Sequence, residues 1–180
     1  MKIEVTYGQY HDAMYSYGIG LGFSHDDCVD AIQDVFCRLI NSKALEKVDN
    51  MRFFLLKCMK NRLLKNYRDS NANKTCYLKD ENFENFEIKV SMIDGILAKE
   101  RQELLKKKVE SALNMLTARQ REAVYLRYMQ EMEYVEIGAL MNLTPDSAKL
   151  SVHRAIKSIR ENPSLKPIAY VTVFALLRSL

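Results

Sequence analysis

The sequence contains no tryptophan and little of the two residues that most often interrupt regular structure, with 6 Gly and 3 Pro among 180 residues. This scarcity argues against collagen-like, low-complexity and turn-rich β architectures. Runs of 18 apolar residues are also missing, so we expect no segment that spans a membrane. The N-terminal residues lack the apolar core of a secretory signal, and we therefore expect a cytoplasmic protein.

The cysteines show no spacing typical of a disulfide framework or a zinc site. Cys28, Cys37, Cys58 and Cys76 include no C-x-x-C pair, and none stands at metal-ligand spacing from the three histidines. The cysteines and histidines also form no nucleophile–base pair that their spacing would support. The sequence therefore predicts reduced thiols, no metal, no cofactor and no catalytic residues.

The sequence does contain enough apolar residues to fold, since 48% are hydrophobic and 28% are charged. The net charge of +4 is too small to identify a partner, but its distribution is informative. Two basic segments, 52–68 and 146–160, flank an acidic stretch at 80–87. Two separated basic helices can make two contacts with a polyanion, and each can equally be a solvated helix face.

Apolar residues recur at helical spacing along much of the chain. Residues 28–40 and 51–67 each place large apolar side chains on one face, and Asp26 or Asp27 can begin the first of these helices. A Thr117–Gln120 capping box predicts a further helix from Ala118 to about Met129. Strand-like alternation of any length is missing, so the pattern predicts an all-α protein.

The helical pattern is lost from about residue 71 to 91, where Asn, Glu and Asp predominate. We therefore predict two small helical domains, residues 1–70 and 92–162, joined by a flexible acidic linker at 71–91. Residues 163–180 end in a strongly apolar stretch, which Pro163 and Pro167 separate from the preceding helix. We expect this tail to form a short helix that either caps the second domain or holds the free protein compact.

The second domain has the layout of a helix-turn-helix: a short helix, a tight turn and a longer basic helix. The short helix is predicted at 134–141, where Gly138 allows the two helices to approach closely. Asn142 can adopt the left-handed conformation at the turn. Thr144 and Pro145 are typical of the N-cap and first position of the next helix.

The longer helix would expose a stripe of side chains that can read DNA. Lys149 can donate to guanine O6 and N7, and Leu150 can contact a thymine methyl group. Lys157 and Arg160 are better placed to contact phosphates. An ordinary helical hairpin is the alternative to a DNA-binding one at this stage.

Two blocks of sequence resemble the extracytoplasmic-function (ECF) group of bacterial RNA polymerase sigma factors. The first, DAIQDVFCRL at 30–39 and FLLKCMKNRLLKNYR at 54–68, is similar to the family's region 2. The second, at 112–122, 126–128, 134–138 and 151–155, is similar to region 4. The resemblance covers most of residues 5–161. It implies an alternative sigma factor that binds core RNA polymerase and promoter DNA, with an anti-sigma factor as a further candidate partner.

The resemblance also implies roles for particular residues. Asn61 would help to hold a flipped base of the −10 element, and the loop at 41–50 would complete the base pocket. The acidic stretch 80–87 would thread the positively charged nucleic-acid channel of the polymerase. The implied contacts are Asp30, Gln33, Asp34 and Arg38 for the β′ clamp helices of the polymerase, Lys57, Lys60, Asn61, Lys65 and Arg68 for the −10 strand, and Lys149, Leu150, Ser151, His153, Arg154 and Lys157 for the −35 element.

Two other classes of function stay open. A stand-alone helix-turn-helix regulator would use its N-terminal domain to sense a signal or to dimerise, and binding to core polymerase separates it from a sigma factor. A nucleic-acid-modifying enzyme would need clustered acidic residues or a metal site, and the sequence shows neither.

Overall fold

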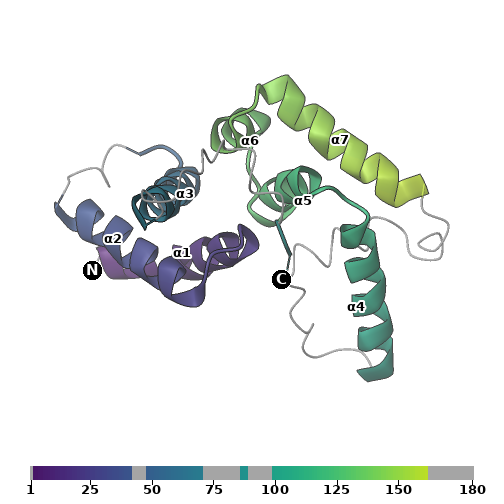
Figure 1. Cartoon of the computed structure of the whole chain (residues 1–180), viewed down its shortest axis with the longest axis horizontal. Helices are drawn as coiled ribbons and strands as arrows, with labels where there is room; N and C mark the ends of the chain where they lie inside the picture. The colour runs from purple at the N-terminus through teal and green to yellow at the C-terminus, as the bar shows by residue number, and fades with distance from the viewer. Residues whose placement is uncertain (1, 42–47, 71–85, 89–98, 162–180) are drawn as a thin grey trace. The chain divides into compact units, whose positions relative to one another are not determined.

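The computed structural model describes residues 2–41, 48–70, 86–88 and 99–161, and all regular structure among them is helical (Figure 1). This confirms the all-α prediction. The chain divides into two compact units, residues 1–85 and 86–180, at a point within the segment we predicted as a linker. Most of that segment, and the apolar tail at 163–180, lie outside the described residues. No helix among the described residues is long and apolar enough to cross a bilayer.

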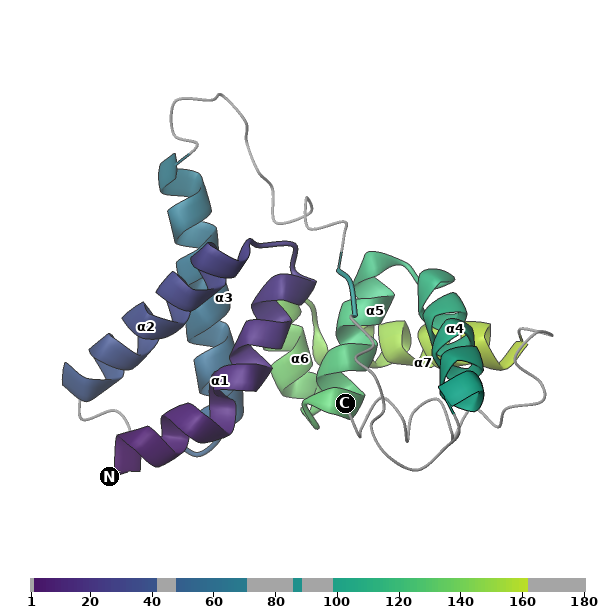
Figure 2. The ribbon, with the colours of Figure 1, turned by 90° about the horizontal axis from the view of Figure 1, so that it is seen from below.

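The described part of the first unit consists of α1 (Lys2–Gly20), α2 (His25–Asn41) and α3 (Met51–Ser70), whose paths can be followed in Figures 1 and 2. Ser24 caps α2, because the Asp27 N–H donates to Ser24 Oγ at 3.2 Å and the Ser24 hydroxyl donates to Asp27 Oδ2 at 2.6 Å. Apolar side chains from all three helices form one core: Met14, Tyr17, Cys28, Ala31, Ile32, Val35, Phe36, Leu39, Leu55, Leu56, Met59 and Leu63.

Helix α1 has no counterpart in the sequence prediction, because its apolar residues form no regular stripe. Its contacts with the rest of the unit include aromatic ones: the ring centroids of Tyr7 and Phe36 lie 4.9 Å apart, and the Tyr15 hydroxyl lies 3.0 Å from His25 Nδ1. Gly18 lets α1 pack closely, because a Cβ there would lie 2.5 Å from Met59 Cε and 2.6 Å from Cys28 Sγ. Aromatic packing and a small residue therefore hold this helix in place.

The second unit contains α4 (Lys99–Asn114), α5 (Ala118–Val124), a π-helical segment (Tyr125–Met129), α6 (Tyr134–Met141) and α7 (Pro145–Glu161). The predicted capping box is confirmed: the Gln120 N–H donates to Thr117 Oγ1 at 3.3 Å, and the Thr117 N–H donates to Gln120 Oε1 at 3.0 Å. One cluster of buried residues joins α4, α5 and α7: Val109, Ala112, Leu113, Leu116, Val124, Ala155 and Ile159.

The predicted helix at 118–129 is continuous, but its last turn widens into the π-helical segment. There the Gln130 N–H donates to the Tyr125 carbonyl at 3.1 Å, and the Met132 N–H donates to the Leu126 carbonyl at 3.0 Å. The buried Gln130 side chain donates to the Tyr125 hydroxyl at 2.9 Å. The widened turn ends at Glu131, which has a left-handed φ of 55°. This local geometry sets the direction in which the chain enters α6.

Candidate nucleic-acid interface

The turn between α6 and α7 has the tight geometry that the sequence predicts. Asn142 is left-handed, with φ 54° and ψ 44°, and the Leu143 N–H donates to the Gly138 carbonyl at 2.8 Å. A Cβ at Gly138 would lie 2.7 Å from the Leu143 carbonyl oxygen and 3.2 Å from the Pro145 nitrogen. Both contacts are with backbone, which cannot move aside as a flexible side chain can. Only glycine fits at residue 138 without displacing the turn.

Two features of α7 fix which of its faces points outward. Thr144 caps the helix, since the Ser147 N–H donates to Thr144 Oγ1 at 3.2 Å. Four apolar residues at helical spacing, Ala148, Val152, Ala155 and Ile159, are buried against the rest of the unit. The opposite face is open to solvent, and its exposed side chains include Lys149, Leu150, His153, Arg154, Lys157 and Arg160.

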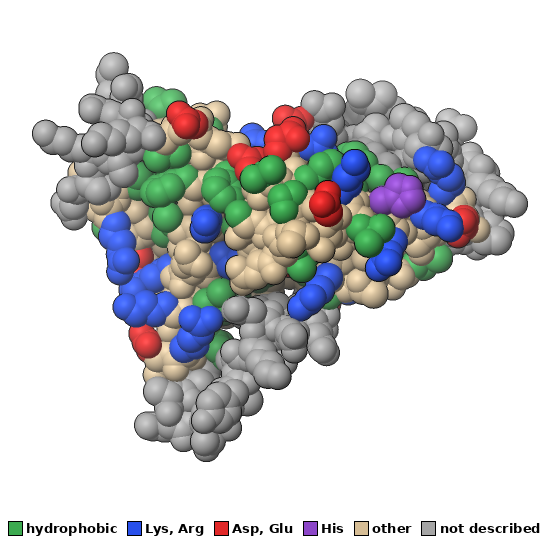
Figure 3. Space-filling model, turned by 90° about the horizontal axis from the view of Figure 1, so that it is seen from above, with side chains coloured by type: hydrophobic (Ala, Val, Ile, Leu, Met, Phe, Trp, Pro, Cys, Tyr) green, Lys and Arg blue, Asp and Glu red, His purple; other side chains and the backbone are tan. Residues whose placement is uncertain are grey.

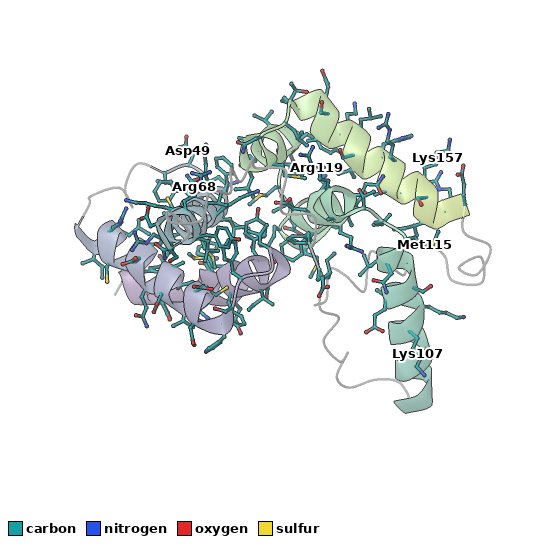
Figure 4. All side chains as sticks on the ribbon, in the orientation of Figure 1. Asp49, Arg68, Lys107, Met115, Arg119 and Lys157 are labelled. Atoms are coloured by element: carbon teal, nitrogen blue, oxygen red, sulfur yellow. The ribbon has the colours of Figure 1, made fainter. Side chains whose placement is uncertain are left out.

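This open face carries most of the residues that the sequence assigns to the −35 element. In Figure 3 a histidine lies among Lys and Arg side chains over α7, and Figure 4 shows Lys157 projecting outward from the helix. Leu150 is 46% exposed on this face. Ser151 is only half-buried, and its hydroxyl donates to the Ser147 carbonyl at 2.9 Å. The face is therefore a cationic ridge with an apolar contact point in its middle.

Helix α3 presents the second set of predicted DNA contacts. Lys57, Asn61, Lys65 and Arg68 are exposed, whereas Lys60 is half-buried. The Lys57 ammonium lies 5.4 Å from the centroid of the Phe53 ring, which holds the long side chain along its own helix. Arg68, labelled in Figure 4, belongs to the last turn of α3. Cations near the C-terminal end of a helix are favoured by its dipole.

A cavity of about 300 Å³ lies between α2 and α3. Asn61 and Lys65 line it from α3, and Asp34 and Arg38 line it from α2. The sequence places these residues in two separate sets, one for the −10 strand and one for the polymerase. The structure brings members of both sets to the walls of one cavity, whose remaining lining residues are Val35, Leu39, Phe54, Cys58 and Arg62.

Arg62 connects the two walls of this cavity, a role that the sequence prediction missed. Its guanidinium forms an ion pair with Asp34, whose side chain is 39% exposed. Its Nε atom is buried and has no hydrogen-bond acceptor within the described part of the chain. Asp34 is therefore engaged inside the first unit, while Asp30, Gln33 and Arg38 on the same helix are exposed. The sequence feature that could have pointed to Arg62 is the Asn61–Arg62 pair, in which the sequence prediction gives a role to Asn61 alone.

The cysteines of the first unit are free thiols, as the sequence predicts for the three that the structure describes. Burial raises the pKa of the Cys58 thiol at the cavity wall, while the charges of Arg38 and Lys57 lower it by a smaller amount. Within the described ranges, no group of three or more His, Cys, Asp and Glu side chains could hold a metal ion.

Comparisons with known proteins cover both units. Residues 106–159, which contain the helix-turn-helix, match the family model described as Sigma-70, region 4. A solved structure, the sigma factor RpoE in complex with the anti-sigma factor NepR from Bartonella quintana, aligns with a TM-score of 0.56 and 22% sequence identity. The alignment covers 89% of this chain and 95% of that chain. None of the curated protein sequences matches this chain.

Proposed function

We propose that this chain is a sigma factor of the sigma-70 family, which binds core RNA polymerase and directs it to promoters with a −10 and a −35 element. The region 4 match and the shared fold support the ECF resemblance of its sequence motifs. The observation that most supports the proposal is the presence, in one chain, of a cationic helix-turn-helix ridge and, on a separate unit, a cavity lined by both polar and apolar side chains. Such a protein works in the cytoplasm and leaves the chemistry of RNA synthesis to the polymerase.

We propose that the ridge on α7 reads the −35 element in the major groove. A groove about 12 Å wide admits one helix, and the exposed side chains of α7 then face the base edges. Lys149 and His153 lie one turn apart and can donate to bases, while Leu150 can contact a thymine methyl group. Arg154 and Lys157 lie further along the helix and can contact phosphates.

We propose that the cavity between α2 and α3 receives a base of the −10 element after strand separation. Its volume of about 300 Å³ is at the small end of ligand pockets, which suits one base. Asn61 can pair with the edge of the base, and Phe54, Val35 and Leu39 supply apolar walls. Lys65 and Arg68 can follow the backbone of the single strand.

The exposed side of α2 is the proposed contact with the polymerase. Asp30, Gln33 and Arg38 are exposed on it, so a partner can reach their side chains. Asp34 contributes mainly by holding Arg62 in place. The sigma factor with the similar fold was solved with an anti-sigma factor, and we propose a regulator of that kind as a further partner of this chain.

Gel filtration of the full chain mixed with core polymerase tests this proposal. We expect the two to elute together, and we expect Asp30→Arg combined with Gln33→Arg to abolish co-elution. Asp12→Arg is the control, since Asp12 is an exposed acid on α1, outside the proposed contact. Failure of the wild type to bind core polymerase, together with retained DNA binding, would instead indicate a stand-alone regulator.

A further inference from the structure

A short segment from within the predicted linker is held firmly on the second unit. Phe86, only 1% exposed, is among the largest fully buried side chains described. Its ring centroid lies 5.3 Å from that of Tyr125, at an interplanar angle of 58°. Ile88 is partly buried against the core cluster of the same unit, and Glu87 between them is exposed. Figure 2 shows the segment 86–88 beside α5.

Arg121 on α5 binds the backbone of this segment as well. Its Nε donates to the Phe86 carbonyl at 2.6 Å, and its Nη1 donates to the Leu113 carbonyl at 3.2 Å. The guanidinium is planar and rigid, so the two hydrogen bonds fix residue 86 relative to the end of α4. A buried ring, a charge-assisted hydrogen bond and a second apolar side chain therefore hold three consecutive residues. We call Phe86 and Arg121 the anchor.

The anchor shortens the chain that connects the two units. From Ser70, the end of α3, there are 16 peptide units to Phe86 and 29 to Lys99, where α4 begins. A chain spans at most about 3.5 Å per residue, which gives about 55 Å with the anchor formed and about 100 Å without it. Because DNA rises about 3.4 Å per base pair, these lengths correspond to about 16 and about 30 base pairs.

We infer that the anchor sets the longest spacer between the −10 and −35 elements that this chain can bridge. The inference rests on the proposed function, in which each unit holds one element of the same promoter. Phe86 is buried in the second unit and Arg121 holds its carbonyl, so both act as positioning residues. The helices that read DNA extend beyond the ends of the connecting chain, so the chain length alone does not give the longest spacer. The test therefore measures the change in the longest usable spacer when the anchor is lost.

Run-off transcription with core polymerase tests this inference on templates whose spacers increase by one base pair at a time. We expect Phe86→Ala to raise the longest usable spacer by several base pairs, up to about 13, because the anchored residues then join the connecting chain. Arg119→Ala is the matched control, since Arg119 is exposed on the same helix as Arg121 and takes no part in the anchor, and its limit should equal that of the wild type.

Two further variants keep the test decisive if Phe86→Ala does not fold. Arg121→Met removes both hydrogen bonds and should shift the limit in the same direction. A ten-residue Gly-Ser insertion after residue 78 leaves the second unit unchanged and should raise the limit by up to about 10 base pairs. Equal limits in the wild type and all folded anchor variants would overturn the inference while leaving the proposed function intact. A wild type that starts no promoter-dependent transcript would contradict both.

Discussion

Helices α7 and α3 are the two proposed DNA-binding helices, and they present opposite shapes. The outer face of α7 is a ridge of exposed side chains, including Lys149, Leu150 and His153, above a fully buried apolar face. Helix α3 instead borders a cavity of about 300 Å³, and its residues Asn61 and Lys65 line that cavity. A ridge suits a groove that already displays its pattern of donors and acceptors, whereas a cavity suits a base that has left the stack.

This difference indicates how the free energy of promoter recognition is divided. Reading the groove of an intact duplex requires no unpairing, so the contacts of α7 can form first. Extracting a base costs a few kcal/mol, which contacts in the cavity must offset. We therefore expect changes on α7 to alter which sequence is bound and changes at the cavity to alter whether the bound duplex opens.

The largest expected effect is the loss of the folded helix-turn-helix, which would remove the α7 ridge. Gly138→Val should destabilise the second unit by about 3 kcal/mol, because the added atoms meet the backbone of the turn. Thermal unfolding followed by circular dichroism, together with binding to −35 DNA, measures the loss. Gly8→Ala is the control: nothing lies within 4 Å of a Cβ at Gly8 in α1, so this change should stabilise the first unit by about 0.5–1 kcal/mol. Equal melting temperatures for the wild type and Gly138→Val would disprove the close packing at the turn.

The next effect concerns the cavity. Asn61→Ala combined with Lys65→Ala should reduce promoter opening by roughly 10- to 100-fold, because contacts of about 1–3 kcal/mol with the extracted base are lost. Closed-complex binding should change much less. Permanganate footprinting measures the opening, and Asn66→Ala, on the same helix but outside the cavity lining, is the control. Undiminished melting in the double variant would remove α3 from the proposed −10 contact.

The ridge should respond differently from the cavity. Lys149→Ala combined with His153→Ala should relax the preference at −35, since each good base contact contributes about 1–3 kcal/mol of discrimination. Lys157→Ala should weaken binding evenly across sequences and lower the salt slope by about 1. Binding selections at two salt concentrations separate these patterns. If the two variants behave alike, the wrong face of α7 has been placed in the groove.

The smallest effect is chemical and is confined to the first unit. Burial, with a smaller contribution from Asp27, raises the pKa of the Cys28 thiol to about 11. At pH 8 we therefore expect iodoacetamide to label the exposed Cys37 and leave Cys28 unlabelled in the folded protein. Above the ordinary thiol pKa, Cys28 loses its thiol proton in the unfolded chain but keeps it in the folded chain. The contribution of this thiol to the free energy of unfolding is therefore lost as the pH rises toward 11. Mass spectrometry of labelled peptides checks the expectation, and fast labelling of Cys28 at pH 8 would contradict it.

The sequence predicts best those features that depend on residues close together in the chain. The Thr117–Gln120 box, the left-handed Asn142 and the small residue at 138 each depend on neighbours within a few residues, and the structure confirms all three. Regular apolar stripes likewise predict α2, α3 and α7 to within a few residues of their ends. Local chemistry and helical periodicity suffice for these features.

The features that the sequence prediction missed depend on contacts between distant residues. Helix α1 is held by aromatic packing on α2, which no periodicity reveals. The Arg62–Asp34 ion pair joins two helices, so pattern alone assigns Asp34 to an outer surface. Phe86 lies in a polar stretch, and its burial becomes evident only with Arg121 and Tyr125 beside it. Each of these is a tertiary contact that a single sequence does not encode at fixed spacing.

Run-off transcription by reconstituted polymerase on a library of promoters tests the central claim most directly. We predict that core polymerase with this chain starts transcription only downstream of paired elements, with Lys149 and His153 setting the upstream preference and Asn61 required for opening. Transcription no different from that of core polymerase alone, by a chain that still binds DNA through α7, would contradict the claim.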